Sequence, residues 1–335
     1  MSIQNSDEEV ITVANEWLTQ GHSVSLVTVV RTWGSSPRPV GSIAAVRDDG
    51  ELVGSVSGGC VEKQLAENII RNKSAKQNAS SADSSVSGGQ IETYHVDDDQ
   101  ARRYGLACGG ELALVFEQLQ HATTLTRLTE SINKRESVVR TLDTVSGDIT
   151  YEPFSRQPDG NNDTALFSYD DRTVKKVFGP GWRLLIIGSG QLSRYTAEFA
   201  LALDYEVIVC EPRPGFKEAW SVNGVTLIDV SPDDAVLEYA TDAKSAVLAL
   251  THDPNVDDLA LLEALPSKAF YVGALGSMRN YEKRKQRLAG LGLEANEIDR
   301  LVGPVGLDID SRTSAEIAVS IIADLIKTRR AIATS

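Results

Sequence analysis

The sequence predicts an α/β protein with an N-terminal mixed α+β domain, residues 1–178, followed by a doubly wound parallel-sheet domain, residues 179–335. Three observations support this prediction. The length of 335 residues is sufficient for two domains. The first half contains strand patterns joined by turns as well as by helices. From Gly179 onward, apolar strand segments alternate with helical segments, which is typical of a parallel sheet covered by helices.

Composition and charge narrow the classes of function. The formal net charge is −14, and such an acidic chain repels a phosphate backbone, so we expect no nucleic acid partner. No apolar run approaches the roughly 20 residues of a membrane helix, and the start MSIQNSDEEV is unlike a signal peptide. We therefore expect a cytoplasmic protein with no membrane partner. Three scattered cysteines, without a C-x-x-C pair, predict free thiols.

The first domain begins with a predicted helix over residues 8–20 that ends at Gly21. The apolar face of this helix is formed by Val10, Ile11, Ala14, Trp17 and Leu18. Residues 74–90 lack an apolar face and are rich in serine and alanine, so we expect a mobile loop there. The other elements that we expect are strands at 23–31, at 41–56 with a turn at Asp48–Gly50, at 91–96, 111–117, 136–143, 147–152 and 165–177, and helices at 61–72 and 123–134.

In the second domain, an apolar strand leads into Gly188-Ser189-Gly190-Gln191 and then a helix. The first glycine of such a turn permits a sharp bend, and the second lets the backbone approach a pyrophosphate at the helix N-terminus. Glu211 ends the next strand about twenty residues later, where an acid binds the ribose of NAD, whereas the nearby Arg213 would favour a 2′-phosphate. The motif therefore predicts a Rossmann-like nucleotide site. The alternative is a crevice that binds another ligand or none.

Two later loops follow strands of the same predicted sheet. His252 lies in the first loop and is a candidate acid–base group or ligand, with the alternative that Thr251 or Asp253 merely caps the next helix. The second loop has the composition of an anion site. Its residues are Gly273, Gly276 and Ser277, followed by Arg279 on the next helix. The alternative here is a turn that requires positive φ at Gly276.

The chain closes with a predicted amphipathic helix from Ser314 to about residue 330, whose start fits a capping box of Thr313 and Glu316. This long apolar helix, together with the two domains, makes a homodimer the expected oligomeric state.

Two of the three cysteines lie beside paired glycines, as Gly58-Gly59-Cys60 and as Cys108-Gly109-Gly110. Glycines beside a thiol let N–H groups converge on the sulfur, which lowers its pKa, and they leave room for a ligand. The helix that follows Cys60 would add its positive end. The spacing matches no zinc site, so we predict no resident metal. The alternative is a pair of core cysteines beside turn glycines, and we expect Cys210 to be buried in a strand.

Several segments, taken in order, are similar to motifs of the xanthine dehydrogenase accessory proteins of the XdhC/CoxI type. These segments are VVRTWGSSPRPVGS, GSVSGGCVE, DDDQARRYGLACGGELALVFE, LLIIGSGQLSRY, LTHDPNVDDLAL, FYVGALGSMRNYEKR and GPVGLDIDSRTSAEIAVSI. The resemblance covers nearly the whole chain. It implies a cytoplasmic chaperone, rather than an enzyme, that binds molybdenum cofactor as molybdopterin or its dinucleotide form.

The resemblance also implies two partners, a cysteine desulfurase that supplies sulfur and an apo molybdenum hydroxylase that receives the cofactor. We expect Cys60 and Cys108 to contact the molybdenum, and the loops of Gly188, Gly190 and Gly273–Ser277 to hold the phosphate. One rival interpretation is an NAD(P)-dependent oxidoreductase that binds its substrate between the two domains, with His252 as the acid–base group. Cys60 and His252 are the two candidate catalytic residues of the chain. Another is a scaffold whose crevice is empty.

Overall fold

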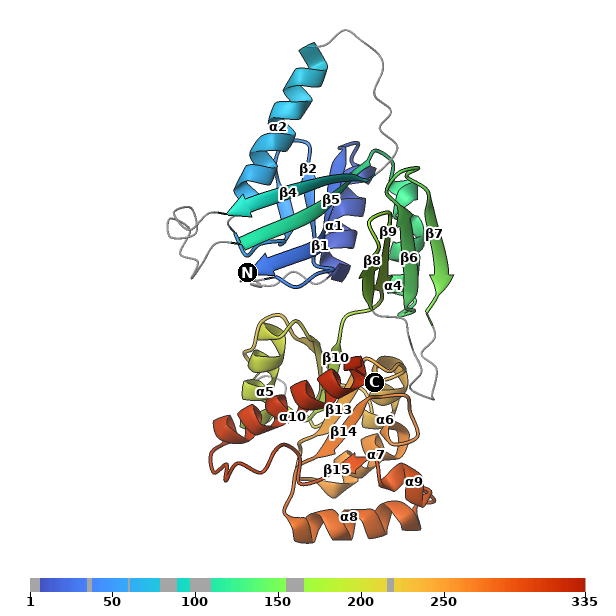
Figure 1. The fold of residues 1–335 in the computed structure, drawn as a ribbon. Coiled ribbons are helices and arrows are strands. Elements are labelled where there is room, and N and C mark those ends of the chain that lie inside the picture. Colours follow the sequence, from blue (N-terminus) through green and yellow to red (C-terminus); the bar gives the residue numbers. More distant parts are fainter. Residues whose placement is uncertain are drawn as a thin grey trace. The chain divides into compact units, whose positions relative to one another are not determined.

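The structure is a computed structural model that describes residues 7–34, 38–59, 61–78, 89–96, 110–154, 166–215 and 220–334. The chain forms two compact units (Figure 1). The N-terminal unit ends at Pro180 and the C-terminal unit begins at Gly181. None of the described helices is both long and apolar enough to span a bilayer.

A five-stranded antiparallel sheet forms the centre of the N-terminal unit, with the strand order β3-β2-β1-β5-β4. Its strands are β1 (Val24–Gly34), β2 (Ile43–Arg47), β3 (Leu52–Gly54), β4 (Gln90–Val96) and β5 (Gly110–Leu119). Helix α1 (Asp7–Thr19) packs on one face of the sheet and helix α2 (Glu62–Asn78) on the other, because alternate residues of β1 and β2 point to opposite sides. The buried face of α1 consists of the five predicted residues, so this prediction is confirmed.

The predicted loop at 74–90 is wrong for its first five residues. They belong to α2, and the alanine, lysine and glutamine among them favour a helix even without an apolar face. Residues 79–88 lie outside the described part of the chain, and β4 begins at Gln90.

A second, four-stranded antiparallel sheet completes the N-terminal unit, in the order β7-β6-β9-β8. Its strands are β6 (Val138–Asp143), β7 (Ile149–Pro153), β8 (Phe167–Tyr169) and β9 (Thr173–Phe178). The segment predicted as one strand at 165–177 is therefore two strands. The chain turns between them at Asp171, whose φ is +73°. A short 3-10 helix, η1 (Ala122–Thr124), and helix α4 (Thr126–Asn133) replace the single predicted helix at 123–134.

A buried ion pair connects the two sheets of this unit. Arg140 on β6 donates to both carboxylate oxygens of Glu117 on β5, at 3.1 Å from Nη1 to Oε1 and through a short contact from Nη2 to Oε2. Both side chains are about 5% exposed or less. Burial alone would lower the pKa of Arg140, but the charge and hydrogen bonds of Glu117 raise it. Arg140 is therefore held as a cation in an apolar setting.

The C-terminal unit contains a six-stranded, wholly parallel sheet in the order β12-β11-β10-β13-β14-β15. Its strands are β10 (Arg183–Ile187), β11 (Glu206–Cys210), β12 (Thr226–Ile228), β13 (Ser245–Ala249), β14 (Tyr271–Ala274) and β15 (Leu301–Val302). Counted along the chain, this is the order 3-2-1-4-5-6 of a Rossmann sheet, which confirms the predicted fold class. The strand order reverses between β10 and β13, where ligands bind in such sheets.

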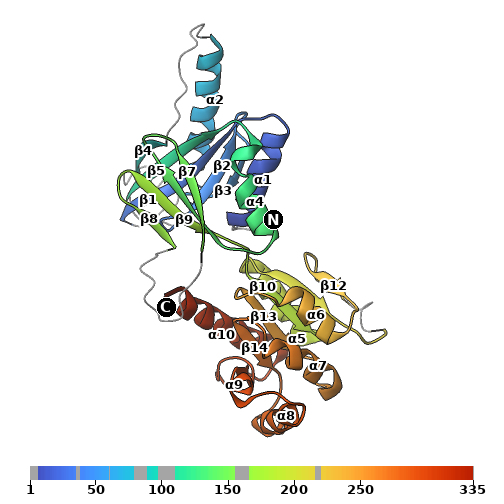
Figure 2. The same cartoon turned by 90° about the vertical axis from the view of Figure 1, so that its right-hand side faces the viewer.

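Helices cover both faces of this sheet. They are α5 (Gln191–Ala202), α6 (Pro232–Tyr239), α7 (Pro254–Ala264), α8 (Met278–Gly290), α9 (Ala295–Ile298) and α10 (Ser314–Thr334). Apolar residues of α6, α7 and α8 pack on one face, and those of α5 and α10 on the other. Figure 2 shows α10 and the pair α6 and α7 on opposite sides of the strands.

The capping box predicted for the closing helix is confirmed. The Glu316 carboxylate accepts the N–H groups of Arg312 and Thr313, at 2.7 and 2.9 Å. In return, the Thr313 hydroxyl accepts the N–H of Glu316 at 3.3 Å.

Replacement of Arg140 by methionine should strongly destabilise the N-terminal unit. The change leaves the Glu117 carboxylate buried without its cation, which costs about 3–5 kcal/mol of the free energy of unfolding. Arg172→Met is the matched control, because the Arg172 side chain that pairs with Asp143 is 65% exposed. Its loss should cost less than about 1 kcal/mol. Urea unfolding followed by circular dichroism measures both. Equal losses in the two variants would contradict the assigned role of the buried pair.

Candidate functional site

The segments that flank Cys60 and Cys108 reach one end of the five-stranded sheet. Gly110, the first residue of β5, pairs with the last residues of both β1 and β4. Strand β3 runs in the same direction as β1, so the chain leaves Gly54 toward this end and enters Gly58-Gly59. Figure 1 shows the arrowheads of β1 and β4 at the same side of the sheet as the start of α2. Cys60, Cys108 and Gly109 lie outside the described residues, and a shared cavity stays a prediction.

The carboxylate of Glu62, in the first turn of α2, organises the loop before Cys60. Its Oε1 accepts hydrogen bonds from the Ser55 hydroxyl at 2.7 Å and from the N–H groups of Val56 and Ser57 at 2.9 and 2.8 Å. Its Oε2 accepts the N–H of Gly59 at 2.8 Å and a short bond from the Ser57 hydroxyl. Burial raises the pKa of Glu62, but these hydrogen bonds outweigh it and lower the pKa to about 2.

Two further amides among the described residues of this loop are also bonded to side chains. The N–H of Gly58 donates to the Ser55 hydroxyl at 3.0 Å, and that of Val61 donates to the Ser57 hydroxyl at 2.8 Å. Gly58 and Gly59 both have positive φ, +80° and +121°, which allows consecutive amides to turn toward nearby acceptors. The expectation that the glycines direct N–H groups at the sulfur is therefore wrong for these amides, because the chain's own oxygens accept them.

At the carboxyl edge of the Rossmann sheet, two strands approach closely at the point where the strand order reverses. Gly188, which follows β10, has a φ of +102°, and a Cβ placed there would lie 2.8 Å from Cγ2 of Thr251 after β13. Only glycine fits between these loops. Gly190 is the N-cap of α5; it makes no side-chain cap bond, and the space around its Cβ position is open. Gln191 is exposed beside Ser314, 3.5 Å from Oε1 to Oγ.

Glu211 is buried, and its carboxylate accepts five hydrogen bonds from its own chain. Ser189 donates its N–H at 2.8 Å and its hydroxyl at 2.9 Å. Arg213 donates its N–H at 3.1 Å, and its Nε and Nη2 both at 2.7 Å. Burial raises the pKa of Glu211, but Arg213 and Ser189 outweigh burial and lower it. In this structure Glu211 therefore holds the Gly188–Gly190 turn, and its predicted role toward a ribose stays a prediction.

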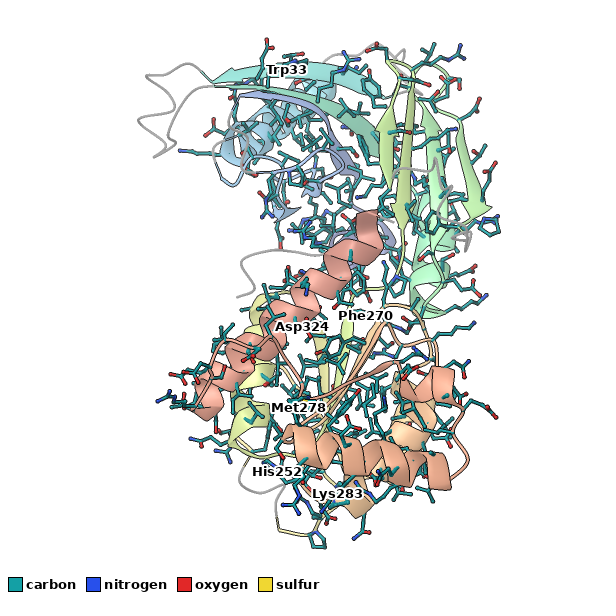
Figure 3. The ribbon with its side chains drawn as sticks, turned by 60° about the horizontal axis from the view of Figure 1, so that its bottom comes forward. Trp33, His252, Phe270, Met278, Lys283 and Asp324 are labelled. Atoms are coloured by element: carbon teal, nitrogen blue, oxygen red, sulfur yellow. The ribbon has the colours of Figure 1, made fainter. Side chains whose placement is uncertain are left out.

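His252 lies at the same edge, in a backbone conformation that non-glycine residues rarely adopt. Its φ is +64° and its side chain is exposed (Figure 3). Asp253 caps α7 by accepting the N–H of Asn255 at 3.0 Å, which confirms the capping alternative for this residue. Thr251 has a different role, because its hydroxyl donates to Asp257 at 2.7 Å. A ligand or acid–base role for His252 stays a prediction.

The glycines of the next loop have separate structural reasons. A Cβ at Gly273, inside β14, would lie 2.6 Å from Cγ2 of Val305, so glycine is required there for packing. Gly276 has a φ of +154°, which confirms the turn alternative, and Ser277 caps α8 by accepting the N–H of Asn280 at 3.4 Å. Arg279 is exposed and makes no ion pair with any residue that the structure describes. Anion binding by this loop stays a prediction.

Comparison with known proteins places the chain in a family. The model described as "XdhC Rossmann domain" matches residues 184–325, and the model described as "XdhC and CoxI family" matches residues 17–78. The chain belongs to the XdhC and CoxI family. The resemblance seen in the sequence motifs is thereby confirmed.

Several relatives of this XdhC and CoxI family member match nearly the whole chain. The molybdenum cofactor insertion chaperone PaoD of Escherichia coli (strain K12) is 28% identical over 96% of this chain and 88% of its own length. A probable xanthine dehydrogenase subunit of Bacillus subtilis (strain 168) is 24% identical over 96% of this chain and 98% of its own. The crystal structure of a xanthine dehydrogenase from Bacillus halodurans has a TM-score of 0.69 and 25% identity, covering 96% of both chains.

Sequence reasoning identified Glu211 but missed the other acids that hold these loops. Glu62 follows Cys60 by two positions in the family motif GSVSGGCVE. An acid in the first turn of a predicted helix, preceded by Ser55 and Ser57, is a pattern that could have predicted hydrogen bonds from the loop to this carboxylate. Asp257 and Asp258 are adjacent acids in a helix that is otherwise mostly apolar, and Arg284 and Arg287 lie one turn apart on α8. Burial raises the pKa of Asp257, although hydrogen bonds from Thr251 and the charge of Arg284 oppose this rise.

Replacement of Glu62 by glutamine should remove one source of acid sensitivity. Because the folded pKa of about 2 lies below the ordinary value of 4.5, the carboxylate stabilises the fold above pH 4.5. That contribution is lost as the pH falls from 4.5 toward 2. Glu62→Gln should cost about 2 kcal/mol at pH 7 and should flatten the stability curve across this pH range. Urea unfolding at a series of pH values measures both effects.

The exposed Glu67, on the same helix, supplies the control. Glu67→Gln should leave the free energy of unfolding within about 0.5 kcal/mol of the wild type. The role assigned to Glu62 is refuted by a Glu62→Gln variant that retains the wild-type pH dependence between pH 4.5 and 2.

Proposed function

We propose that this chain is a maturation factor that binds molybdenum cofactor, assists its sulfuration and passes it to an apo molybdenum hydroxylase of the xanthine dehydrogenase type. Homology to a molybdenum cofactor insertion chaperone, over 96% of the chain, supports the maturation role. The structural observation that carries the proposal is the strand register. It brings the segments that flank Cys60 and Cys108 to one end of a sheet.

The chemistry of the thiol segments suits the molybdenum end of the cofactor. Molybdenum in this cofactor is bound to sulfur, and thiolates are soft ligands for such a centre. The amides at 56–59 and 61 are bonded to Glu62 and to serine hydroxyls, so they do not stabilise a free thiolate. We propose that the Cys60 thiol loses its proton when it binds a metal. Such a thiol would bind the cofactor without performing catalysis.

The carboxyl edge of the Rossmann sheet suits the phosphate of a ligand. The first turn of α5 presents N–H groups without a side-chain cap beside the open space at Gly190. Because Glu211 already accepts five hydrogen bonds, a ribose diol would have to displace Ser189 or Arg213 from it. An NAD(P)-dependent oxidoreductase is for this reason the weaker alternative. We propose that this edge binds a phosphate ester, as molybdopterin carries.

The partners in this proposal follow from the family. A cysteine desulfurase would supply the sulfur, and an apo-hydroxylase would receive the finished cofactor in the cytoplasm. The proposal also includes a homodimer. Basic surfaces on either partner would suit a chain whose formal net charge is −14.

Anaerobic titration of the purified chain with isolated molybdenum cofactor tests the thiol part of the proposal. Cys60→Ala and Cys108→Ala should each weaken binding at least about tenfold, a loss of about 1.4 kcal/mol. Cys210→Ala is the matched control, because Cys210 is fully buried in β11 and burial raises its pKa to about 12. Wild-type affinity in both the Cys60 and Cys108 variants would exclude the thiols as ligands.

A further inference from the structure

A buried relay of hydrogen bonds connects the two loops at the carboxyl edge that follow β13 and β14. Asp257, on α7, accepts the N–H of Thr251 at 3.1 Å and the Thr251 hydroxyl at 2.7 Å, both at Oδ1. Its other oxygen, Oδ2, accepts Nη2 of Arg284 at 3.0 Å. Arg284, on α8, donates its Nη1 to the carbonyl of Leu275 at 3.1 Å. One carboxylate and one guanidinium therefore join Thr251 to Leu275.

Both charged groups of the relay are buried. The side chain of Asp257 is 0% exposed and that of Arg284 is 5% exposed. If Arg284 rotated away, Asp257 would be left buried without a cation, and if Asp257 rotated away, Arg284 would keep only its 3.4 Å ion pair with Asp258. Both changes are unfavourable, because a buried charge loses its partner or part of its pairing. The relay therefore fixes the distance between the two loops more firmly than exposed side chains would.

The two ends of the relay lie beside features that the proposed function uses. Thr251 lies against Gly188, at the turn before α5, and it immediately precedes His252. Leu275 immediately precedes Gly276 and Ser277, which lead into α8, with Ser277 as its N-cap. Figure 3 labels His252 and Met278, the first residue of α8, both at this edge of the sheet.

We propose that Asp257 and Arg284 are positioning residues that set the spacing of these two loops for a phosphate ester. The inference rests on the proposed binding of a phosphate at this edge, and it adds residues that do not themselves contact the ligand. A lysine at position 284 would keep the positive charge and the ion pair with Asp257. A lysine lacks the planar fork that reaches a carboxylate and a carbonyl together, so the loops would lose their fixed spacing.

Arg183→Lys is a matched control at the opposite edge of the same sheet. Arg183 also binds a carboxylate and a carbonyl, through Nε and Nη2 to Glu206 at 2.8 and 3.1 Å and through Nη1 to Tyr239 at 3.3 Å. It lies at the first residue of β10, away from the carboxyl edge. The two variants make the same chemical change at sites with and without the proposed positioning role.

Calorimetric titration of the full chain with inorganic pyrophosphate, alongside thermal unfolding, tests the inference. Arg284→Lys should weaken pyrophosphate binding about tenfold or more, because displaced loops meet the anion poorly. Arg183→Lys should bind like the wild type. Thr251→Val is a second variant that removes the hydroxyl donor at the far end of the relay and keeps the side-chain shape. It should also weaken binding.

The outcomes separate this inference from the proposed function. If the wild type binds pyrophosphate and both Arg284→Lys and Thr251→Val bind it equally well, the positioning role is overturned and the phosphate site stands. If the wild type binds no pyrophosphate, the phosphate site and the positioning role are both overturned. Loss of affinity in Arg284→Lys and Thr251→Val, with thermal shifts no larger than that of Arg183→Lys, supports the inference.

Discussion

A carboxylate removed from water costs several kcal/mol in desolvation unless hydrogen-bond donors surround it. Three such groups hold the loops of this protein: Glu211 and Asp257 are buried, and Glu62 is partly buried. Glu62, Glu211 and Asp257 each accept at least three hydrogen bonds from their own chain. Most of these donors are backbone amides, loop hydroxyls or arginines. Because each carboxylate would lose several donors together if a loop moved, these hydrogen bonds hold the loops in place.

This constraint explains why glycines cluster at the same places. A single carboxylate can accept consecutive amides only if the backbone turns sharply, which Gly58 and Gly59 permit through positive φ. Gly188 likewise allows the turn held by Glu211 to contact Thr251, which Asp257 holds from the other side. The glycines of both motifs therefore serve the loop geometry directly. The space around the Cβ positions of Gly190 and Gly59 is open.

Elements with a periodic apolar pattern were predictable from the sequence. The face of α1 and the apolar segments that give the first five strands of the parallel sheet are local patterns of burial, and the structure confirms them. The sixth strand, β15, has only two residues and was not predicted. Residues 74–78 were not predictable in this way. They are the last five residues of α2, and this end of the helix has no apolar face of its own but continues from the packed first turns. Strands β8 and β9 were merged, since the turn at Asp171 contains neither glycine nor proline.

The partners of the buried acids could not be predicted for a different reason. Glu211 was identified by its spacing, but the spacing does not show that Ser189 and Arg213 occupy it. The pairing of Asp257 with Arg284 joins residues 27 positions apart on two helices, and only the packing of α7 beside α8 determines it. Tertiary contacts therefore decide which candidate residues remain open to a ligand.

Whether this chain carries molybdenum cofactor can be tested by measuring the cofactor itself. The protein would be purified without oxygen from cells that synthesise the cofactor, then oxidised, and the released pterin and the molybdenum would be quantified by fluorescence and mass spectrometry. We expect pterin and molybdenum in comparable amounts, both well above a mock purification. Protein that carries neither, from cells that load their molybdenum hydroxylases normally, would refute the proposed function.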